Sequence, residues 1–261
     1  MLRKSSIAKI AHGLLSGLAL VLAIAAAGYA GAADIYDQAV AHPGRSDHDV
    51  RRDAIDHPAQ VLRLARIRPG MRVADILAAD GYYSELLSDI VGPRGHVILF
   101  NNPIYDKWGS PDLAKRLAHD RLPNVEHRTA DLAHMGRAPA SLDAALLIKV
   151  YHDLYWVDST HEWPQVDPAS VLDQLARALK PNGILVLVDH SAKPGTGSSA
   201  ASELHRIDED YARRDFESHG FTLVAKGDFL HRSDDARDQI TYKGPMVGRT
   251  DRFVLIFHKR A

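Results

Sequence analysis

Two histidines in this sequence are candidates for acid–base chemistry. His152 follows an apolar segment over 142–150, and His190 follows another over 184–188, directly after Asp189. Imidazole titrates near neutral pH, and a neighbouring carboxylate can orient it as a general base. If the two segments are adjacent strands, both rings would line one pocket. For each histidine, the alternative is a structural hydrogen bond at the edge of a sheet.

Other polar residues stand where predicted strands end. Asp75, Asn101 and Asp131 each lie at or just beyond the end of an apolar segment, and Gly81 opens a helical one. Ligands in parallel α/β sheets bind outside the carboxyl ends of the strands, so these positions predict a binding crevice after the first strand. The structural alternatives are a cap or turn at Asp75, a turn at Asn101, helix-start geometry at Gly81 and a helix cap at Asp131.

A metal site is a further alternative for the histidines, of which the chain has 15. His152, His190, His205 and Asp189 would form one if they converge, because imidazole and carboxylate together suit zinc or iron. Paired spacing such as H-E-x-x-H is absent, so the sequence assigns no metal ligand.

The elements that must position these residues alternate along the chain. After a polar lead over 34–56, apolar and amphipathic periodicity predicts helices and strands in turn. The helices are expected over 58–65, 82–91, 111–120, 168–179 and 203–219, and the strands over 71–77, 96–100, 125–129, 142–150, 184–188, 221–225 and 252–258. This pattern predicts an α/β fold with a mostly parallel sheet covered on both faces. The last two strands have no helix between them and should pair antiparallel.

Three further features bear on a pocket near these strands. The loop over 191–202 is rich in Gly, Ser and Ala and is a candidate lid. Arg206 is expected to pair with Asp208 or Glu209, or alternatively with a substrate carboxylate. An aromatic insertion comprises Tyr155, Trp156, His161 and Trp163. Two interpretations are open for it: an apolar wall for a substrate, or packing over the sheet edge.

Composition and the N-terminus narrow the class of protein. A net charge of −1 predicts no nucleic-acid partner, and the lack of cysteine excludes disulfides and thiolate chemistry.

A basic start, an apolar stretch over 13–30 and small residues ending at Ala33 predict a signal peptide over 1–33 and a mature domain over 34–261. We therefore expect a periplasmic or secreted protein without stable membrane insertion. The alternative is an uncleaved membrane anchor.

From about Asp49 to its C-terminus, the chain resembles the class I S-adenosylmethionine-dependent methyltransferases. It is most similar to the predicted methyltransferases exported by Gram-negative bacteria. The segments that carry this resemblance are Asp75-Ile76, Gly81-Tyr82-Tyr83-Ser84-Glu85-Leu86-Leu87, Asn101-Asn102-Pro103, Tyr151-His152-Asp153, Val188-Asp189-His190, Leu204-His205-Arg206-Ile207-Asp208 and Gly248-Arg249-Thr250-Asp251-Arg252-Phe253. The resemblance implies a Rossmann-like fold with a seven-stranded sheet in the order 3-2-1-4-5-7-6.

The resemblance also implies a cofactor, S-adenosyl-L-methionine, and residues to bind it. These are Asp75 and the glycine-motif positions Leu77, Ala79 and Gly81, with Asn101 at the ribose and Asp131 at the adenine. Here the first two glycine positions carry side chains, and Asn101 stands where an acidic residue is usual. Two functions follow: a methyltransferase for a small-molecule acceptor, with His152 and His190 lining the acceptor pocket, or a non-catalytic binding protein of the cell envelope that has lost the cofactor.

Overall fold

The computed structural model describes residues 34–136, 138–158 and 162–261. The predicted signal peptide lies outside the described residues. The chain divides into Met1–Asp34 and a compact unit, Ile35–Ala261, to which everything below refers. In the part of the chain that is described, no helix combines the length and apolar character needed to cross a membrane.

Seven strands form one sheet in the order β3-β2-β1-β4-β5-β7-β6, as predicted. They are β1 Arg72–Ile76, β2 His96–Asn101, β3 Val125–Thr129, β4 Leu142–Ile148, β5 Leu179–His190, β6 Phe221–Gly227 and β7 Arg252–Lys259. The first five pair in parallel, whereas β7 is antiparallel to both β5 and β6. Beyond β1 and β4 the chain crosses to opposite sides of the sheet, so the carboxyl ends of these strands mark the switch point where a ligand site is expected.

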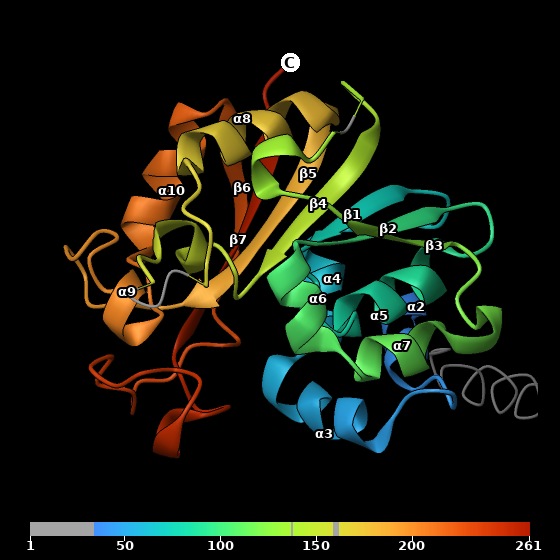
Figure 1. Cartoon of the computed structure of the whole chain (residues 1–261), viewed down its shortest axis with the longest axis horizontal. Helices are drawn as coiled ribbons and strands as arrows, with labels where there is room; N and C mark the ends of the chain where they lie inside the picture. Colours follow the sequence, from blue (N-terminus) through green and yellow to red (C-terminus); the bar gives the residue numbers. More distant parts are fainter. Residues whose placement is uncertain (1–33, 137, 159–161) are drawn as a thin grey trace, which may run out of the picture. The chain divides into compact units, whose positions relative to one another are not determined.

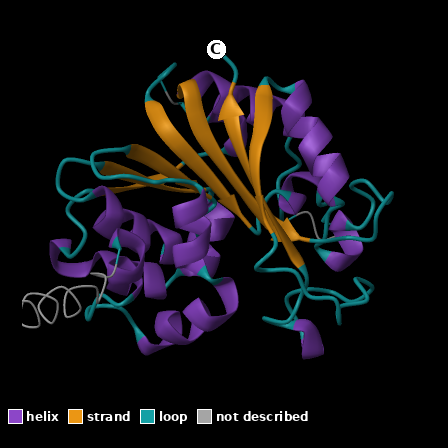
Figure 2. Ribbon diagram, turned by 180° about the vertical axis from the view of Figure 1, so that it is seen from behind, coloured by secondary structure: helices purple, strands orange, loops and turns teal. Residues whose placement is uncertain are grey.

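Helices cover the two faces of the sheet (Figure 1; Figure 2). The α-helices are α2 Ile35–Val40, α3 Asp47–Asp56, α4 Pro58–Leu64, α5 Tyr82–Val91, α6 Pro103–Gly109, α7 Asp112–Leu117, α8 Pro168–Ala178, α9 Ala201–Leu204 and α10 Glu209–Ser218. The 3₁₀ helices are η1 Ala118–Asp120, η2 Leu132–His134, η3 His152–Tyr155 and η4 Gly244–Met246. One apolar core joins α8 and α10 to the sheet, and a second joins α2, α4 and α5 to its other face.

The polar lead contains two helices that the sequence pattern does not predict, α2 and α3. Helix α3 lacks an apolar stripe, and polar interactions define it instead. Ser46 caps its N-terminus by accepting from the Asp49 amide, and Arg52 pairs with Asp56 at 2.7 Å within it. Hydrophobic periodicity therefore could not reveal α3.

Helix α6 is likewise missing from the prediction, because Asn-Asn-Pro reads as a turn signal. In the structure the Asn102 side chain accepts from the Tyr105 amide at 2.8 Å and Pro103 occupies the first helical turn. The same residues thus serve as a helix cap and first turn. The predicted helix over 111–120 is also divided, into α7 and η1.

The prediction of one helix over 203–219 is wrong. The backbone turns left-handed at His205, with φ 51°, and Ile207 then bridges to Ser191 beside the end of β5. Asp208 caps a new helix, α10, by accepting from the Asp210 amide. The break matters for function because it turns His205 towards the end of β4.

Arg206, within this break, is fully buried. Its partner is Asp235, at 2.8 Å, and it also donates to the carbonyl of Ser191. The expectation of an intramolecular ion pair is therefore confirmed, but the predicted partners Asp208 and Glu209 are wrong. Asp208 instead caps α10 and accepts from the Gly195 amide, which fastens the candidate lid at that point.

Candidate functional site

A cavity of about 490 Å³ lies at the carboxyl ends of β4 and β5. We call it the β4–β5 cavity; its lining residues are Tyr105, Trp108, Lys149, His152, Asp153, Trp156, His190, His205, Thr241 and Tyr242. The two predicted histidines are therefore brought together, with their ring centroids 5.9 Å apart. The strand order that makes β4 and β5 neighbours is the reason.

His152 is buried and held by two carboxylates. Its Nδ1 lies 2.7 Å from Asp189 Oδ1, its backbone amide donates to Asp189 Oδ2 at 2.9 Å, and its Nε2 lies 3.2 Å from Asp153 Oδ1. Burial alone would lower the pKa of His152, but the charges of Asp153 and Asp189 outweigh it and raise the pKa to about 10. At neutral pH His152 is an imidazolium, which can donate a proton but cannot accept one.

His190 has the opposite character. Its Nδ1 lies 2.8 Å from Thr250 Oγ1, which leaves Nε2 as the ring nitrogen available to a ligand. Burial, together with the charge of His152, lowers the pKa of His190 well below its usual value. The ring is therefore neutral at pH 7. The sequence suggested that Asp189 would orient His190; its carboxylate instead binds the ring of His152 and only the backbone amide of His190.

Asp153 and His205 complete this group. Asp153 is buried, its Oδ2 accepts from Tyr105 at 2.5 Å, and its Oδ1 lies 3.4 Å from His205 Nδ1. Burial would raise the pKa of Asp153, but the charge of His152 lowers it well below the usual range. The carboxylate stays ionised at neutral pH.

Aromatic side chains form one wall of the cavity, as one interpretation of the insertion predicted. Trp156 lines the cavity and packs 4.9 Å from the ring of His205. Trp163 is buried and stacks with Trp108 at a centroid distance of 6.3 Å. Tyr155 turns to Asp215 instead, and His161 lies outside the described residues.

Lys149, directly after β4, reaches the cavity from a left-handed backbone with φ 61°. Its Nζ lies 2.9 Å from Asp56, which also binds Arg52 and Arg252. Burial and the charge of Arg52 lower the pKa of Lys149 to about 8. The Asp56 carboxylate, at the end of α3, thus binds three cationic side chains, of which Lys149 lines the cavity.

The predicted cofactor loop follows β1. Leu77, Ala79 and Gly81 all have positive φ, at 55°, 52° and 80°. This is the left-handed conformation for which glycine is normally used, so the loop keeps the backbone of a glycine motif despite its side chains. Only at Gly81 is glycine also required for space, since an added Cβ would lie 2.7 Å from Leu99 Cδ1.

Other predicted cofactor residues are occupied within the protein. Asn101 is fully buried; its Oδ1 accepts from the Ala79 amide at 2.9 Å and its Nδ2 donates to the Ala79 carbonyl. Helix α6 also presses on this loop, because a Cβ at Gly109 would lie 2.4 Å from the Ala79 carbonyl carbon. Asp131 is exposed and caps η2 through the Ala133 amide.

Some of these residues fit S-adenosylmethionine and others do not. The loop has the required backbone, and buried Asn102 Nδ2, directly after β2, has no hydrogen-bond partner in the described part of the chain. That orphaned donor suits a ligand acceptor at the end of β2. Gly109 of α6 packs closely against the backbone of Ala79 in the same loop, so this observation counts against the fit.

Replacing Leu77 with glycine tests whether this side chain blocks the crevice. Leu77 is 2% exposed and packs in the core with Ile98 and Phe100. We expect Leu77→Gly to lower the free energy of unfolding by about 2 kcal/mol, because the cavity it leaves outweighs relief of the left-handed backbone. Urea unfolding measures this, with exposed Val224→Ala as the control; an unchanged stability together with tighter cofactor binding would place Leu77 in the crevice instead.

Asp75 is buried and accepts from Ser84 Oγ at 2.7 Å. Burial raises its pKa to about 7. Because the folded protein holds this proton more tightly than the unfolded chain, the contribution of Asp75 to stability is complete below pH 3.8 and is lost as pH rises to 7.

We expect Asp75→Asn to remove this pH dependence. Relative to the wild type, the variant should gain up to about 4 kcal/mol in free energy of unfolding between pH 4 and pH 8. Chemical denaturation at both pH values measures it, and Asp47→Asn, on the exposed face of α3, is the control. Parallel stability curves for wild type and variant would show that Asp75 is ionised throughout.

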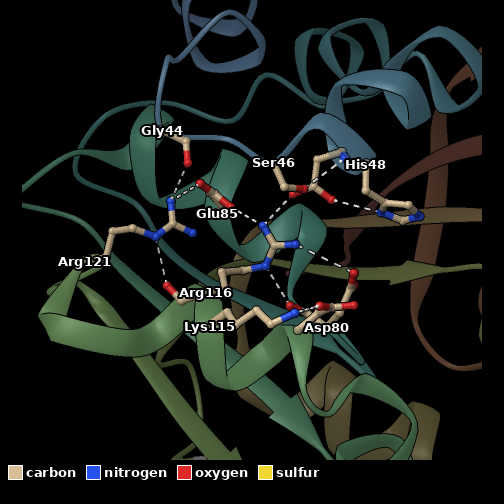
Figure 3. Close-up of a pocket in the computed structure, with 10 residues that line it drawn as sticks. Gly44, Ser46, His48, Asp80, Glu85, Lys115, Arg116 and Arg121 are labelled. Atoms are coloured by element: carbon tan, nitrogen blue, oxygen red, sulfur yellow. Dashed lines mark hydrogen bonds and ion pairs between the residues drawn. The ribbon is translucent and has the colours of Figure 1, made fainter.

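A second pocket, of about 300 Å³, lies among α3, α5 and α7 (Figure 3). Arg116 is central to it, with Nη1 2.9 Å from Asp49 and a further bond to Glu85, while its Nε donates to the Asp80 carbonyl at 2.7 Å. Arg121 also pairs with Glu85. The carboxylates here are engaged by the arginines, and this cluster anchors α3 and α7 around the start of α5.

The chain is similar to known proteins in part of its sequence and in its fold. Residues 109–187 match the model of a methyltransferase domain family. A solved S-adenosylmethionine-dependent methyltransferase from Aquifex aeolicus is 17% identical, with a TM-score of 0.54 over 82% of this chain and 100% of that one. This chain has the class I methyltransferase fold. A second such methyltransferase, from Mesorhizobium loti, is 13% identical with a TM-score of 0.53, over 80% of this chain and 100% of the other.

One protein of similar fold is named for another reaction. The [4+2]-cyclase SpnF is 14% identical, with a TM-score of 0.55 over 82% of this chain and 81% of that one. Among curated proteins, no sequence match was found. The domain match over residues 109–187 and the methyltransferase neighbours thus agree on the class I methyltransferase fold.

Several residues of the cavity escaped the sequence analysis as site residues. Lys149 lay inside the strand predicted over 142–150, whereas β4 ends at Ile148, so the residue directly after this strand was not recognised. Asp153 was noticed only as part of a motif. Tyr105 and Trp108 lie on α6, whose helical character was missed, and Tyr242 lies in a long segment without periodicity, so no local signal indicated them.

Proposed function

We propose that this protein is an S-adenosylmethionine-dependent methyltransferase whose small-molecule acceptor binds in the β4–β5 cavity. The observation that carries the proposal is the meeting of two histidines, His152 and His190, which line the β4–β5 cavity with ring centroids 5.9 Å apart at the switch point of a methyltransferase fold. A neutral imidazole next to a fixed imidazolium suits removal of a proton from an acceptor that becomes nucleophilic.

The cofactor would be held by the loop after β1, with Asp75 beneath it, and by the end of β2. The predicted contacts of Asn101 and Asp131 with the ribose and adenine remain predictions; the orphaned amide of Asn102 is an additional candidate. When bound, S-adenosylmethionine supplies an activated methyl group. The protein's own part is to position the acceptor in line with that group.

The acceptor site is apolar on one side and charged on the other. Trp156, Tyr242 and Tyr105 all line the cavity and offer flat surfaces, which suits an aromatic or other planar molecule. His190 Nε2 is the available proton acceptor, which suits an acceptor group that loses a proton as it reacts. We therefore propose a hydroxyl-bearing acceptor, such as a phenol.

A transfer assay tests this proposal. The protein is incubated with S-adenosylmethionine and a panel of phenols, aliphatic alcohols, amines and thiols, and S-adenosylhomocysteine is measured. We expect product with phenols above the rate without acceptor. Turnover confined to amines or thiols would contradict the acceptor class, and no turnover with any compound would favour the second function.

A second function, ligand binding without methyl transfer, has one observation in its favour. Asn101 and Gly109 close the loop at Ala79, where the cofactor must approach. In that case the β4–β5 cavity would bind a small molecule while the loop remains shut.

Gly109→Ala separates the two functions. An added methyl group at Gly109 would collide with the backbone of Ala79 and so disfavour the closed arrangement. We expect S-adenosylmethionine to bind several-fold more tightly to the variant, because part of its binding free energy no longer opens the loop. Calorimetric titration measures this, with Lys107→Ala on the exposed side of α6 as the control. Undetectable binding to both wild type and variant would support the non-catalytic function.

We also propose that the protein belongs to the exported methyltransferases of Gram-negative bacteria and acts in the periplasm or outside the cell. The signal-peptide pattern over 1–33 and the distinctive segments around His205 and Arg249 support this assignment. Expression of the full chain in a Gram-negative host, followed by mass measurement of the protein in the periplasmic fraction, should find cleavage near Ala33. A full-length product in the cytoplasm would contradict it.

A further inference from the structure

The geometry points to a divalent transition-metal site formed by His152, Asp153 and His205 in the β4–β5 cavity. One potential ligand atom from each residue lies within 4.8 Å of the other two. Asp153 Oδ1 is 3.2 Å from His152 Nε2 and 3.4 Å from His205 Nδ1. Ligands about 2.1 Å from one tetrahedral ion lie roughly 3.4 Å from each other, so the group is already spaced for coordination.

The surroundings of the group match those of a metal site. Asp189 accepts at His152 Nδ1, 2.7 Å away, which directs Nε2 towards Asp153. Tyr105 donates to Asp153 Oδ2 at 2.5 Å, which leaves Oδ1 for the ion. Such outer partners fix the orientation of metal ligands and are a regular part of these sites.

The cavity supplies the remaining coordination positions. Three protein ligands on one side of an ion leave room for water or substrate, and the group borders the 490 Å³ space. Two imidazoles with one carboxylate favour zinc or iron(II) over magnesium or calcium, which prefer oxygen ligands. The sequence hypothesis of a metal site named His190 and Asp189; the geometry replaces them with Asp153 as the carboxylate ligand.

A second group of a histidine and two carboxylates differs from this one in its exposure and its partners. His48, Asp49 and Asp80 are also close together, but His48 is largely exposed and Asp49 is bound by Arg116. No comparable cation pairs with Asp153 in the described structure beyond the two histidines themselves. The alternative for His152, Asp153 and His205 is therefore a hydrogen-bonded cluster that holds the break before α10 in place.

Metal titration distinguishes the two. The full-length protein is treated with chelator, dialysed and titrated with Co²⁺, whose visible absorption reports tetrahedral or five-coordinate binding, and with Zn²⁺ by calorimetry. We expect one ion per chain with both metals. Absence of a stoichiometric site at neutral pH would overturn the proposal.

Variants locate the ion. His205→Gln should weaken binding at least about 100-fold and, because His205 lies at the cavity edge, leave the fold intact as checked by circular dichroism. Tyr105→Phe should weaken metal binding about 10-fold by loosening Asp153.

His219→Gln, which removes a histidine paired with Asp173 on α8, is the control and should bind the metal as the wild type does. Equal affinity in the His205 variant and the wild type would contradict the site, as would equal losses in the His205 and His219 variants.

This inference goes beyond the transferase proposal and does not depend on it. Binding is measured without S-adenosylmethionine or acceptor, so a protein that binds the ion but transfers no methyl group would uphold one and contradict the other. If both hold, the ion takes the place of the proton on His152 Nε2 and supplies the positive charge there. An acceptor hydroxyl bound to the ion would have a lower pKa, which eases proton transfer to His190.

Discussion

Replacing Asp56 with asparagine is expected to lower the free energy of unfolding by about 3–5 kcal/mol. Asp56 is buried and binds Arg52 at 2.7 Å, Lys149 at 2.9 Å and Arg252. An amide removes the negative charge but leaves the three cations close together in a space of low polarity. These partners come from α3, from the residue after β4 and from β7. Because Lys149 also lines the β4–β5 cavity, the loss should loosen this part of the cavity as well as the fold.

The same carboxylate predicts how stability depends on pH. Burial would raise the pKa of Asp56, but the charges of Lys149 and Arg52 outweigh it and lower the pKa far below its usual value. The stabilisation is therefore present above the ordinary aspartate pKa and is lost as pH falls. Guanidinium unfolding at pH 7 and pH 3 should show that Asp56→Asn costs less at the lower pH. Asp47→Asn, in the first turn of the same helix, should stay within about 0.5 kcal/mol of wild type. A loss under 1 kcal/mol in the Asp56 variant would mean that the cations are solvated independently.

The second large effect concerns catalysis. His190→Gln is expected to reduce kcat for methyl transfer by about 100-fold or more, because glutamine retains hydrogen bonding but cannot accept a proton. The dissociation constant for S-adenosylmethionine should be unchanged, since His190 ends β5, which β4 separates from β1 and its loop. Steady-state kinetics and calorimetry measure the two quantities separately.

Two controls sharpen this experiment. His219→Gln changes a histidine that follows α10 and pairs with Asp173 on α8, and it should have wild-type kinetics. Thr250→Val removes the hydroxyl that lies 2.8 Å from His190 Nδ1, and should reduce kcat less than His190→Gln because the ring can still accept a proton. If His190→Gln raised KM with unchanged kcat, His190 would only bind the acceptor, and the role of proton acceptor would be wrong.

The sheet could be predicted because its information is local and apolar. Strands β1, β2, β4, β5 and β7 each carry a buried run. The bounds of β3 and α5 are those that the sequence predicted. Their order came from the resemblance and was then found in the structure. Because β4 and β5 are neighbours in this order, two histidines at the ends of these strands were expected to lie close together.

The polar interactions could not be predicted in the same way. Helix α3 depends on ion pairs to residues as distant in sequence as Lys149 and Arg252, and no local pattern encodes these partners. The orientation of Asp189 towards His152 depends on side-chain geometry at the ends of two strands. His205 reaches the site only because the chain breaks there, at a point where helical periodicity continues on both sides.

The fold alone does not fix the reaction. A [4+2]-cyclase has a fold similar to that of this chain, as methyltransferases do, at comparably low identity. Function lies in the site, and here the two parts of the site give different indications. The β4–β5 cavity is arranged for proton transfer, whereas the loop after β1 has the backbone of a cofactor site but is in contact with α6.

The most direct test of the proposed function is therefore titration of the wild-type protein with S-adenosylmethionine and, in parallel, with S-adenosylhomocysteine. We expect one molecule of either compound to bind per chain, with a micromolar dissociation constant weakened by the work of moving α6 away from Ala79. Saturable heat of binding that Gly109→Ala strengthens would support the account. No heat for either compound at high micromolar concentration, in wild type and variant alike, would contradict a methyltransferase and leave the β4–β5 cavity as the site of a binding protein.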